Sequence, residues 1–350
     1  MKTMLCTLLF VVLSLNLDAV EKPALSLSWT PQVSGSSASI RGIKAIDERH
    51  AWLCGANGTL SKTTDGGAHW VSLKAPGAGD LDFRDIEAFD GETAWLMSAG
   101  VGKKSFIYKT VDGGKSWQVV YNMEHEKGFL NTINFLNPKQ GVAVSDPIDD
   151  RLFVLSTPDG GASWNRIPPD LLPAMKDDEY LFAASGSCIA SYGTNHLWVA
   201  TGGAVARVFR TENGGKDWAV FGTPMTSGSS SKGIFSIAFL NTRNGVIVGG
   251  DYTKEKEGGS CVAWTEDGGI TWKQPEHAKK MAFRSSVAWL THNKKILALA
   301  VGPAGSSYSL DLGRSWTHFP GNFHTLSVGN SSSAIWAAGA DGRVARLTIQ

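Results

Sequence analysis

The feature that most constrains this chain of 350 residues is a short phrase that occurs six times. Each copy reads Thr/Ser-x-Asp-x-Gly-x-x-Trp, with Asn213 in place of the acid in the fourth copy. The copies occupy residues 63–70, 110–117, 157–164, 211–218, 265–272 and 309–316, so successive acids lie 44 to 54 residues apart. A repeat of this length is typical of architectures built from four-stranded units, such as β-propellers.

Each phrase sits within the same order of short apolar segments. In the first unit, residues 39–46, 51–54 and 59–64 predict three strands, and the phrase leads into a fourth strand from Trp70. Further inner strands are expected at residues 84–89, 131–135, 186–190, 235–239, 285–289 and 324–328, which makes seven. The sequence therefore predicts an all-β fold, a seven-bladed β-propeller, with a six-bladed propeller as the alternative.

The seventh unit has no phrase of its own. Its third strand, expected at residues 343–349, runs to the end of the sequence. We expect residues 25–29 to return as its fourth strand, to stop at Thr30-Pro31, and to place Trp29 where other units have the phrase tryptophan. Pairing of the N-terminal strand with the C-terminal blade closes the ring and removes free sheet edges. Residues 20–350 are then one propeller domain, which we expect to be a monomer.

The start of the chain reads as a secretory signal peptide at residues 1–19. Lys2 precedes an apolar stretch from Met4 to Leu15, and Leu17-Asp18-Ala19 resembles a cleavage site. We therefore expect an exported protein, periplasmic or extracellular, that meets a membrane only through a partner or an uncleaved signal. A net charge of +1 without a basic run gives no reason to expect a nucleic-acid partner.

The sequence gives no pattern for a metal or a cofactor, and we expect neither. The cysteines beyond the signal, Cys54, Cys188 and Cys261, have no metal-ligand spacing, and we expect them to be buried as small apolar residues. One carboxylate per phrase falls short of the about six to eight oxygens that calcium prefers. Phosphate-loop, dinucleotide and nucleophile-elbow motifs do not occur.

The phrase residues are assigned a structural role, because each phrase is complete as a turn. Glycine accepts the positive φ of an Asp-Gly-Gly hairpin, the acid accepts backbone N–H groups, and the preceding hydroxyl meets the acid. The tryptophan is expected to wedge between neighbouring sheets. The structural residues are Asp65, Asp112, Asp159, Asn213, Asp267 and Asp311, with Trp70, Trp117, Trp164, Trp218, Trp272 and Trp316.

Function is expected at the opposite pole of the ring, where the inner strands begin. Three long connections, at residues 165–181, 221–232 and 251–260, emerge there, and equivalent positions differ from blade to blade. The candidate binding residues are Arg41, Arg84, Asn131, Arg207, Arg284 and His324. Several cations around one channel mouth suit an anionic ligand or an acidic protein surface. The alternative is that each arginine pairs with a neighbour such as Asp85 or Asp146.

A catalytic role would need paired carboxylates or an activated nucleophile at this pole. The candidates for such a role are Asp146, Asp251 and Tyr252, for which the sequence gives no pairing, while His324 stands alone. We therefore expect no catalytic residue and a non-catalytic propeller that binds a protein partner. An enzyme, if the chain were one, would be glycoside-hydrolase-like.

The six phrases resemble the Asp-box, or bacterial neuraminidase (BNR) repeat. With inner strands such as residues 39–43, nearly the whole mature chain is similar to the photosystem II stability and assembly factor family. That resemblance implies a seven-bladed propeller outside the cytoplasm that binds membrane-protein assembly intermediates, and hence a role in assembly or stability of an envelope or membrane complex. Fold transfers from such a resemblance better than activity does.

Two alternatives come with this resemblance. Residues 182–186, 201–210 and 249–252 look closest to non-photosynthetic bacterial relatives often labelled oxidoreductases or glycosyl hydrolases, so glycan binding, sialidase-type hydrolysis and redox activity are the competing hypotheses. Sialidases share the Asp-box but have six blades, an arginine triad and an Arg-Ile-Pro before the first box. Here residues 166–168 follow the third box, and Arg41, Arg84 and Arg284 would have to imitate the triad, which disfavours that hypothesis.

Overall fold

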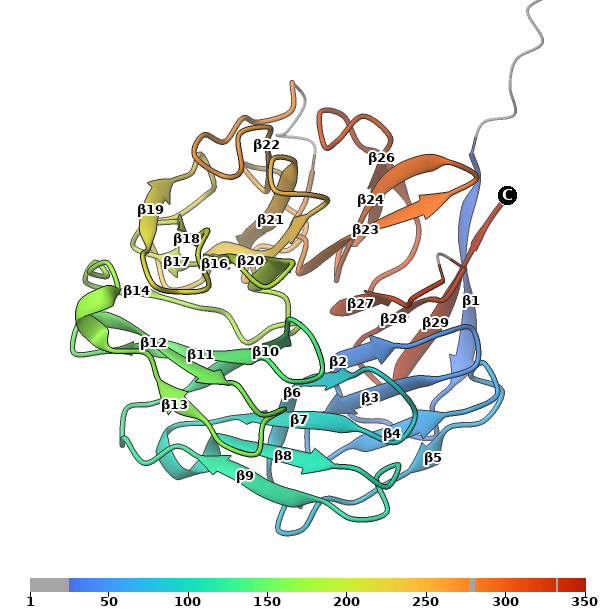
Figure 1. The fold of residues 1–350 in the computed structure, drawn as a ribbon. Helices are drawn as coiled ribbons and strands as arrows, with labels where there is room; N and C mark the ends of the chain where they lie inside the picture. Colours follow the sequence, from blue (N-terminus) through green and yellow to red (C-terminus); the bar gives the residue numbers. More distant parts are fainter. Residues whose placement is uncertain (1–24, 277–280, 332) are drawn as a thin grey trace, which may run out of the picture.

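The computed structural model describes residues 25–276, 281–331 and 333–350, and the signal predicted at residues 1–19 lies outside them. The described residues form seven antiparallel sheets arranged as a ring around a central axis (Figure 1). The seven-bladed propeller is therefore confirmed, and the six-bladed alternative is wrong. Within the described part of the chain, no helix has the length and apolar character needed to cross a membrane.

The first four blades follow one another along the chain. Blade 1 contains β2 (Ile40–Ala45), β3 (Ala51–Gly55), β4 (Leu60–Thr63) and β5 (Val71–Ser72). Blade 2 contains β6 (Asp82–Ala88), β7 (Ala94–Ala99), β8 (Phe106–Thr110) and β9 (Gln118–Asn122), with the short helix η1 (Gly102–Lys104) between β7 and β8. Blade 3 contains β10 (Leu130–Phe135), β11 (Gly141–Ile148), β12 (Arg151–Thr157) and β13 (Asn165–Arg166). Blade 4 contains β15 (Ile189–Tyr192), β16 (His196–Ala200), β18 (Arg207–Thr211) and β19 (Ala219–Gly222).

Blade 5 departs from the simple pattern. It contains β20 (Lys232–Phe239), β21 (Gly245–Asp251) and β22 (Val262–Thr265), and its fourth strand is reduced to a bridge between Trp264 and Lys273. Two short strands from earlier connections join its inner edge, β14 (Glu179–Tyr180), which follows η2 (Pro169–Leu171), and β17 (Gly202–Gly203). Blade 6 contains β23 (Ser286–His292), β24 (Lys295–Gly302), β25 (Gly305–Ser309) and β26 (Thr317–Phe319). Blade 7 contains β27 (Thr325–Val328), β28 (Ile335–Ala338) and β29 (Arg343–Ile349) and is completed by β1 (Leu27–Val33).

The N-terminal strand closes the ring, as predicted. Figure 1 shows β1, in blue, beside the red β29, and the register pairs Leu27 with Ile349 and Trp29 with Leu347. In blade 2, Lys109 pairs with Gln118, the residue that follows the phrase tryptophan. In blade 7, Arg346 pairs in the same way with Thr30, the residue that follows Trp29, so Trp29 does occupy the position of a phrase tryptophan. The expected stop at Thr30-Pro31 is wrong, because β1 continues to Val33. Proline is tolerated there since β1 is an edge strand, whose outer N–H groups need no ladder partner.

The hydrophobic core lies between neighbouring blades rather than inside any one of them. Buried clusters fill each of the seven interfaces between adjacent sheets in the described part of the chain. In several interfaces a buried second-strand tryptophan reaches the phrase of the next blade. The Trp95 and Trp198 indoles donate to the carbonyls of Gly160 and Gly268, at 3.1 and 2.8 Å. The third and fifth phrases therefore link two blades as well as two strands.

The six phrases all form the same turn. In the second copy the Thr110 hydroxyl donates to Asp112 at 2.8 Å and accepts the Gly114 N–H at 3.0 Å. The Asp112 carboxylate also accepts the hydroxyl and amide of Ser116, and these hydrogen bonds lower the pKa of Asp112. Corresponding hydroxyl contacts occur in the other copies, from Thr63, Thr157, Thr211, Thr265 and Ser309.

Replacing the hydroxyl of one phrase should destabilise the fold measurably. In Thr110→Val the buried Gly114 N–H loses its acceptor and Asp112 loses a donor, which should lower the free energy of unfolding by about 1–3 kcal/mol. Thr110→Ser keeps the hydroxyl and is the control, expected within about 0.5 kcal/mol of the unaltered chain. Urea unfolding of the two variants measures the difference, and equal stability of the Thr110→Val and Thr110→Ser chains would contradict this assignment.

Candidate functional site

The start of several inner strands carries a β-bulge at the same structural position. The register shifts once near the beginning of β2, β6, β10 and β20, and the residue inserted is Arg41, Arg84, Asn131 or Phe235 respectively. A bulge leaves one residue unpaired and re-aims its side chain. Three of the four inserted residues, Arg41, Arg84 and Phe235, line one cavity at the channel mouth.

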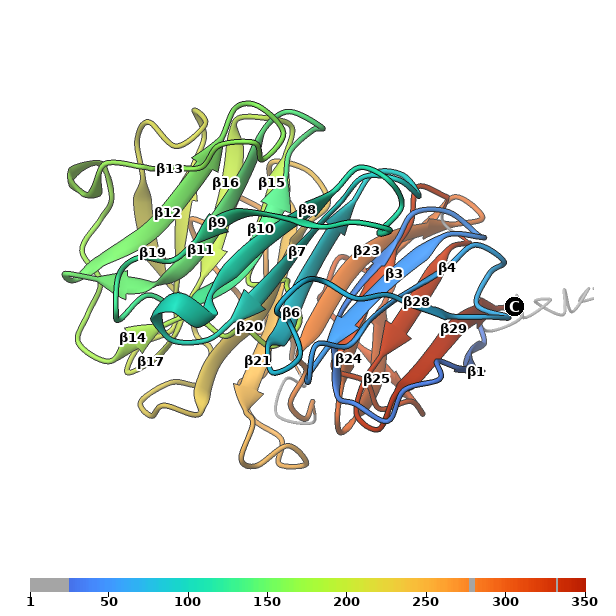
Figure 2. The ribbon, with the colours of Figure 1, turned by 90° about the horizontal axis from the view of Figure 1, so that it is seen from below.

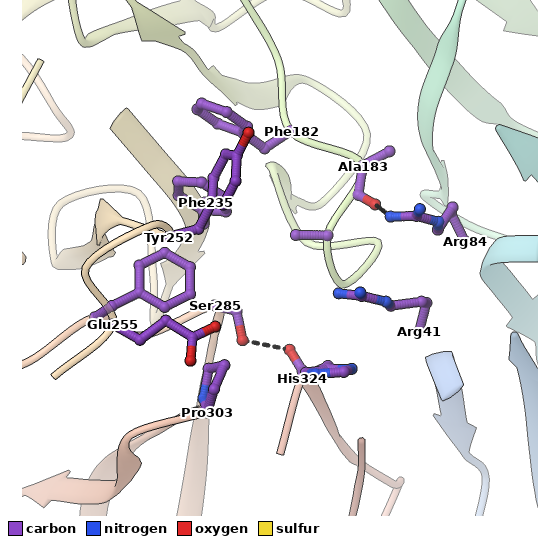
Figure 3. A pocket seen from close by; sticks show the side chains of 12 residues that line it. Arg41, Arg84, Phe182, Ala183, Phe235, Tyr252, Glu255, Ser285, Pro303 and His324 are labelled. Carbon is purple, nitrogen blue, oxygen red and sulfur yellow. Dashed lines mark hydrogen bonds between the residues drawn. The ribbon is translucent and has the colours of Figure 1, made fainter. Parts of the chain in front are cut away.

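A cavity of about 370 Å³ lies at this mouth. It is lined on one side by Arg41 and Arg84 and on the other by aromatic side chains (Figure 3). The lining residues are Arg41, Arg84, Phe182, Ala183, Ala184, Phe235, Tyr252, Glu255, Phe283, Ser285, Pro303 and His324. We call this cavity the mouth pocket.

The aromatic wall of the mouth pocket is built from segments far apart in the sequence. Phe182 stacks on Phe235 with ring centroids 3.9 Å apart, and Phe283 meets Phe235 edge-on at 4.7 Å. Tyr252 lies edge-on to Phe182 and Phe235, at 6.5 and 6.1 Å, and is about half exposed. Offset-stacked and edge-to-face rings are favourable geometries, so the wall is a preformed apolar surface.

The two arginines of the opposite wall differ in how they are held. Arg84 donates to Asp82 at 2.5 Å and to the Ala183 carbonyl at 2.7 Å, so its charge is compensated and its position fixed. Arg41 forms no ion pair within the described residues. Burial and the neighbouring Arg84 lower the pKa of Arg41, which nonetheless stays charged. Arg41 is thus the cation that remains available to an anionic group.

The remaining polar groups of the mouth pocket modulate this charge. Glu255 lies across the pocket from Arg41 (Figure 3). The His324 imidazole lies 3.3 Å from the Ile40 carbonyl, and burial together with Arg41 lowers the pKa of His324 to about 4. The imidazole is therefore neutral near pH 7 and a weak base. Ser285 is committed to the His324 carbonyl, to which it donates at 2.6 Å.

The predicted long connections support the aromatic wall. In Figure 2 the strands β14 and β17 lie on the same side of the ring as the loop that follows β21. Glu179 is fully buried in β14, where it pairs with Arg207, accepts the Thr201 hydroxyl at 2.6 Å and accepts the Lys176 amide at 2.9 Å. This buried ion pair anchors the segment that leads directly into Phe182.

The structure gathers only part of the predicted site. Arg41, Arg84, His324 and Tyr252 line the mouth pocket, whereas the predicted binding residues Arg207, Arg284 and Asn131 do not. Arg207 is used by the Glu179 pair, and Asn131 donates to Asp146 and to the Phe129 carbonyl, both at 3.0 Å. The buried Arg284 turns into blade 6, where it donates to Ser307.

The carboxylates considered for catalysis are used internally and do not form a pair. Asp146 accepts the side chain of Asn131 and the amide of Leu181, and burial raises the pKa of Asp146 to about 6. Asp251 accepts the Thr253 hydroxyl at 2.6 Å. Neither residue lines the mouth pocket. A glycosidase needs two carboxyl groups facing one bond, and these two do not offer that arrangement.

The sequence prediction missed most of the aromatic wall. Its members Phe182, Phe235 and Phe283 were not proposed as site residues, and neither was the acid Glu255. Phe182 follows the acidic connection and Phe283 precedes an expected inner strand, so an apolar residue beside each strand start was the available signal. It was not decisive, because a phenylalanine near a strand end is more often part of an ordinary core.

Metal chemistry and reactive thiols find no support in the described residues. Within residues 25–276, 281–331 and 333–350 no group of His, Cys, Asp and Glu side chains could hold a metal ion. Cys54, Cys188 and Cys261 are buried, as predicted, and all three are free thiols. Burial raises the pKa of each thiol, which makes thiolate chemistry unfavourable.

The channel behind the mouth pocket holds a buried acid, Asp85. Its Oδ2 accepts the Ile133 amide at 2.8 Å and the Thr132 hydroxyl at 2.9 Å, which ties blade 2 to blade 3. Burial, and then the nearby Glu87, raise the pKa of Asp85 to about 8. The alternative that each arginine pairs with a neighbouring acid holds for Arg84, whose partner is Asp82, but Asp85 pairs with neither Arg41 nor Arg84 among the described contacts.

Asp85 should make the stability of the fold depend on pH. Its folded pKa lies above its unfolded value of about 4, so the folded chain binds more protons between these values and loses stability as pH rises from about 4 to about 8. Asp85→Asn stays neutral and can still accept both hydrogen bonds. The free energy of unfolding of Asp85→Asn, relative to that of the unaltered chain, should therefore increase by on the order of a few kcal/mol between about pH 5 and about pH 8.5. Urea unfolding at the two pH values tests this, with the exposed Asp80→Asn as control; a constant difference would contradict it.

The fold and the mouth pocket define a class of protein, the seven-bladed Asp-box propeller with a charged and aromatic channel mouth. The chain matches the family model described as "Photosynthesis system II assembly factor YCF48" over residues 22–121 and 85–229. Together these overlapping matches cover more than half of its length, and the chain belongs to this family. The resemblance read from the Asp-boxes is therefore confirmed.

Individual relatives agree with this assignment. The chain is 26% identical to the photosystem II assembly protein Ycf48 of Thermosynechococcus vestitus, over 77% of this chain and 81% of that protein. A solved structure of YCF48 bound to D1 peptide superposes with a TM-score of 0.63 at 18% identity, covering 91% of this chain and 94% of the other. YCF48 from Cyanidioschyzon merolae gives a TM-score of 0.63 at 17% identity, covering 91% and 98%. At these identities the two structures show the propeller fold.

Proposed function

We propose that this protein is a non-catalytic assembly factor that holds a segment of a partner protein in the mouth pocket, during assembly or stabilisation of a membrane complex. The observation that carries this proposal is Arg41, a guanidinium without an ion-pair partner in the described residues, facing a preformed aromatic wall across a cavity of about 370 Å³. The family's assembly role and a related propeller bound to a peptide support it.

The chemistry of the two walls specifies the kind of segment. A carboxylate of the partner would accept charge-assisted hydrogen bonds from Arg41, and an aromatic or aliphatic side chain a few residues away would pack on Phe182, Phe235 and Tyr252. The occupant we propose is therefore an extended acidic and apolar stretch of a membrane-protein subunit. Since Glu255 stands across the pocket, a strongly acidic segment without an apolar residue should bind less well.

Selection from random peptides tests this function without knowledge of the partner. Peptides displayed on phage and selected on the immobilised chain should be enriched in an Asp, a Glu or a terminal carboxylate within a few residues of an aromatic side chain. A glycan panel screened on the same surface should show no binding. Enrichment of sequences without an acid, or binding of a glycan alone, would refute the proposal.

We also propose that the protein acts outside the cytoplasm. The support is the pattern of residues 1–19, a basic start followed by an apolar stretch and a small-residue cleavage site. Export predicts that alkaline phosphatase fused after residue 24 is active in a bacterial host, because that enzyme needs an oxidising compartment for its disulfides. An inactive but intact fusion would count against export and leave the peptide-binding proposal unaffected.

A further inference from the structure

A second cavity lies within blade 6, away from the walls of the mouth pocket. Its volume is about 360 Å³, and Arg284, Ser306 and His318 line it together with the apolar Ala282, Ala304 and Phe319. Arg284 and the neighbouring Phe283 face different cavities, because Phe283 lines the mouth pocket. We call this second cavity the blade 6 cavity.

The polar centre of the blade 6 cavity is a buried arginine. Arg284 is only 3% exposed, and its Nε and Nη2 donate to the Ser307 hydroxyl at 3.2 and 2.9 Å. Its Nη1 donates to the carbonyls of Phe283, at 2.9 Å, and Ala282, at 3.4 Å. No carboxylate of the described residues pairs with it, and burial lowers the pKa of Arg284 to about 10. A buried charge is normally paired, so a guanidinium satisfied only by neutral oxygens is an unusual arrangement.

His318 provides a second donor beside Arg284. Its Nδ1 lies 2.8 Å from the Ser307 hydroxyl oxygen, which already accepts N–H groups from Arg284. The single hydroxyl hydrogen of Ser307 therefore points to Nδ1, and the neutral imidazole carries its own proton on Nε2. Burial and the Arg284 charge lower the pKa of His318, which keeps the ring neutral near pH 7.

Ser306 is not available to a ligand. Its hydroxyl accepts the Trp29 indole N–H at 2.9 Å and donates to the Gly321 carbonyl at 2.7 Å. Gly305 leaves the approach to Arg284 open, because a Cβ placed on Gly305 would lie 3.7 Å from Arg284 Nη2. The cavity thus offers one permanent cation and one neutral N–H donor beside apolar side chains.

We propose that the blade 6 cavity binds a small monocarboxylate. One uncompensated guanidinium matches a single negative charge, and its Nη2 keeps one N–H that is not donated to a protein acceptor. Ala282, Ala304 and Phe319 accept a short apolar body. A phosphate or sulfate dianion would bring a second negative charge to a site that holds one cation. This site is separate from the mouth pocket and does not depend on the function proposed for it.

Trp29 supplies a reporter for binding. Its indole donates to Ser306 and its ring stacks on Phe319 at 6.2 Å, so both of its neighbours line the cavity. In ¹H–¹⁵N spectra at constant ionic strength, the Trp29 indole resonance, assigned with Trp29→Phe, should shift and saturate on titration with propionate. Propionamide, which has the same shape without the charge, should give no saturable shift, and phosphate should bind at least about tenfold more weakly.

Variants separate a specific site from a general salt effect. Arg284→Gln should weaken propionate binding at least about tenfold. His318→Phe should have the same effect, and it tests the proposal even if Arg284→Gln does not fold. Arg314→Gln, an exposed arginine of the same blade, is the matched control and should leave the titration unchanged. Equal shifts with propionamide, a preference for phosphate, a response that does not saturate, or unchanged binding in His318→Phe would each overturn the proposal.

Discussion

Reversing Arg41 and Arg84 to glutamate is expected to abolish binding of peptides selected on the mouth pocket. Each charge-assisted hydrogen bond to a carboxylate contributes about 1.5–3 kcal/mol, and a glutamate in the same place adds repulsion. The double variant should therefore bind at least about 100-fold more weakly in fluorescence anisotropy with a labelled peptide. The double variant loses the two guanidinium groups of the proposed binding surface. It should keep its fold, because the blades are held together by their interfaces.

Single variants distinguish the roles of the two arginines. Arg41→Gln removes the available cation and should account for most of the loss, whereas Arg84→Gln should act by releasing the Ala183 carbonyl to which Arg84 donates. Arg243→Glu, an exposed arginine at the pole of the Asp-boxes, is the matched control for charge and should bind peptide as the unaltered chain does. Undiminished binding by the double variant would contradict the proposal that peptides bind in the mouth pocket.

Replacing Glu179 with glutamine is expected to give the largest loss of stability among changes near the site. Glu179 is buried with Arg207, and removing one partner of such a pair leaves an uncompensated buried charge. We expect the free energy of unfolding to fall by about 3 kcal/mol, at the low end for buried pairs because Arg207 keeps some exposure. Peptide affinity should fall too, since Glu179 anchors the segment leading to Phe182.

Two further variants serve as controls for Glu179→Gln. Glu266→Gln breaks another Glu–Arg pair, with Arg314, but both of these side chains are 42% exposed, so it should cost less than about 1 kcal/mol. Adding Arg207→Met to Glu179→Gln removes the stranded cation and should restore part of the stability. Urea unfolding compares all three variants, and a Glu179→Gln chain no less stable than Glu266→Gln would show that the buried pair does not stabilise this segment.

Much of this fold could be predicted because its repeated motif forms its hydrogen bonds within a single turn. A hydroxyl two residues before an acid, followed by glycine and tryptophan, specifies one hairpin without reference to distant residues, and counting such hairpins gives the blades. The closing strand was predictable because the seventh unit lacked a fourth strand. The end of β1 was not, since a proline stops a central strand but not an edge strand.

The candidate site was only half predictable for a related reason. The strand starts identified which residues approach the channel mouth, but not which ones point into it. Arg207 and Arg284 carry the same charge as Arg41, yet buried oxygens of Glu179 and Ser307 turn them inward. Such partners lie 23 or more residues away in the sequence, so tertiary contacts decide them. The aromatic wall likewise exists only where distant connections meet.

Site-specific photo-crosslinking tests the central claim most directly. Tyr252 lies in the mouth pocket and Tyr192 ends an inner strand at the opposite pole, and their exposures, 47% and 45%, are nearly equal. A photoreactive phenylalanine analogue at each position, activated in cells of the source organism, should form an adduct from position 252 and not from 192. Mass spectrometry should place that adduct in an acidic and apolar stretch of a membrane-complex subunit. Adducts of equal yield from both positions, or from position 192 alone, would contradict the proposal that the mouth pocket holds the partner.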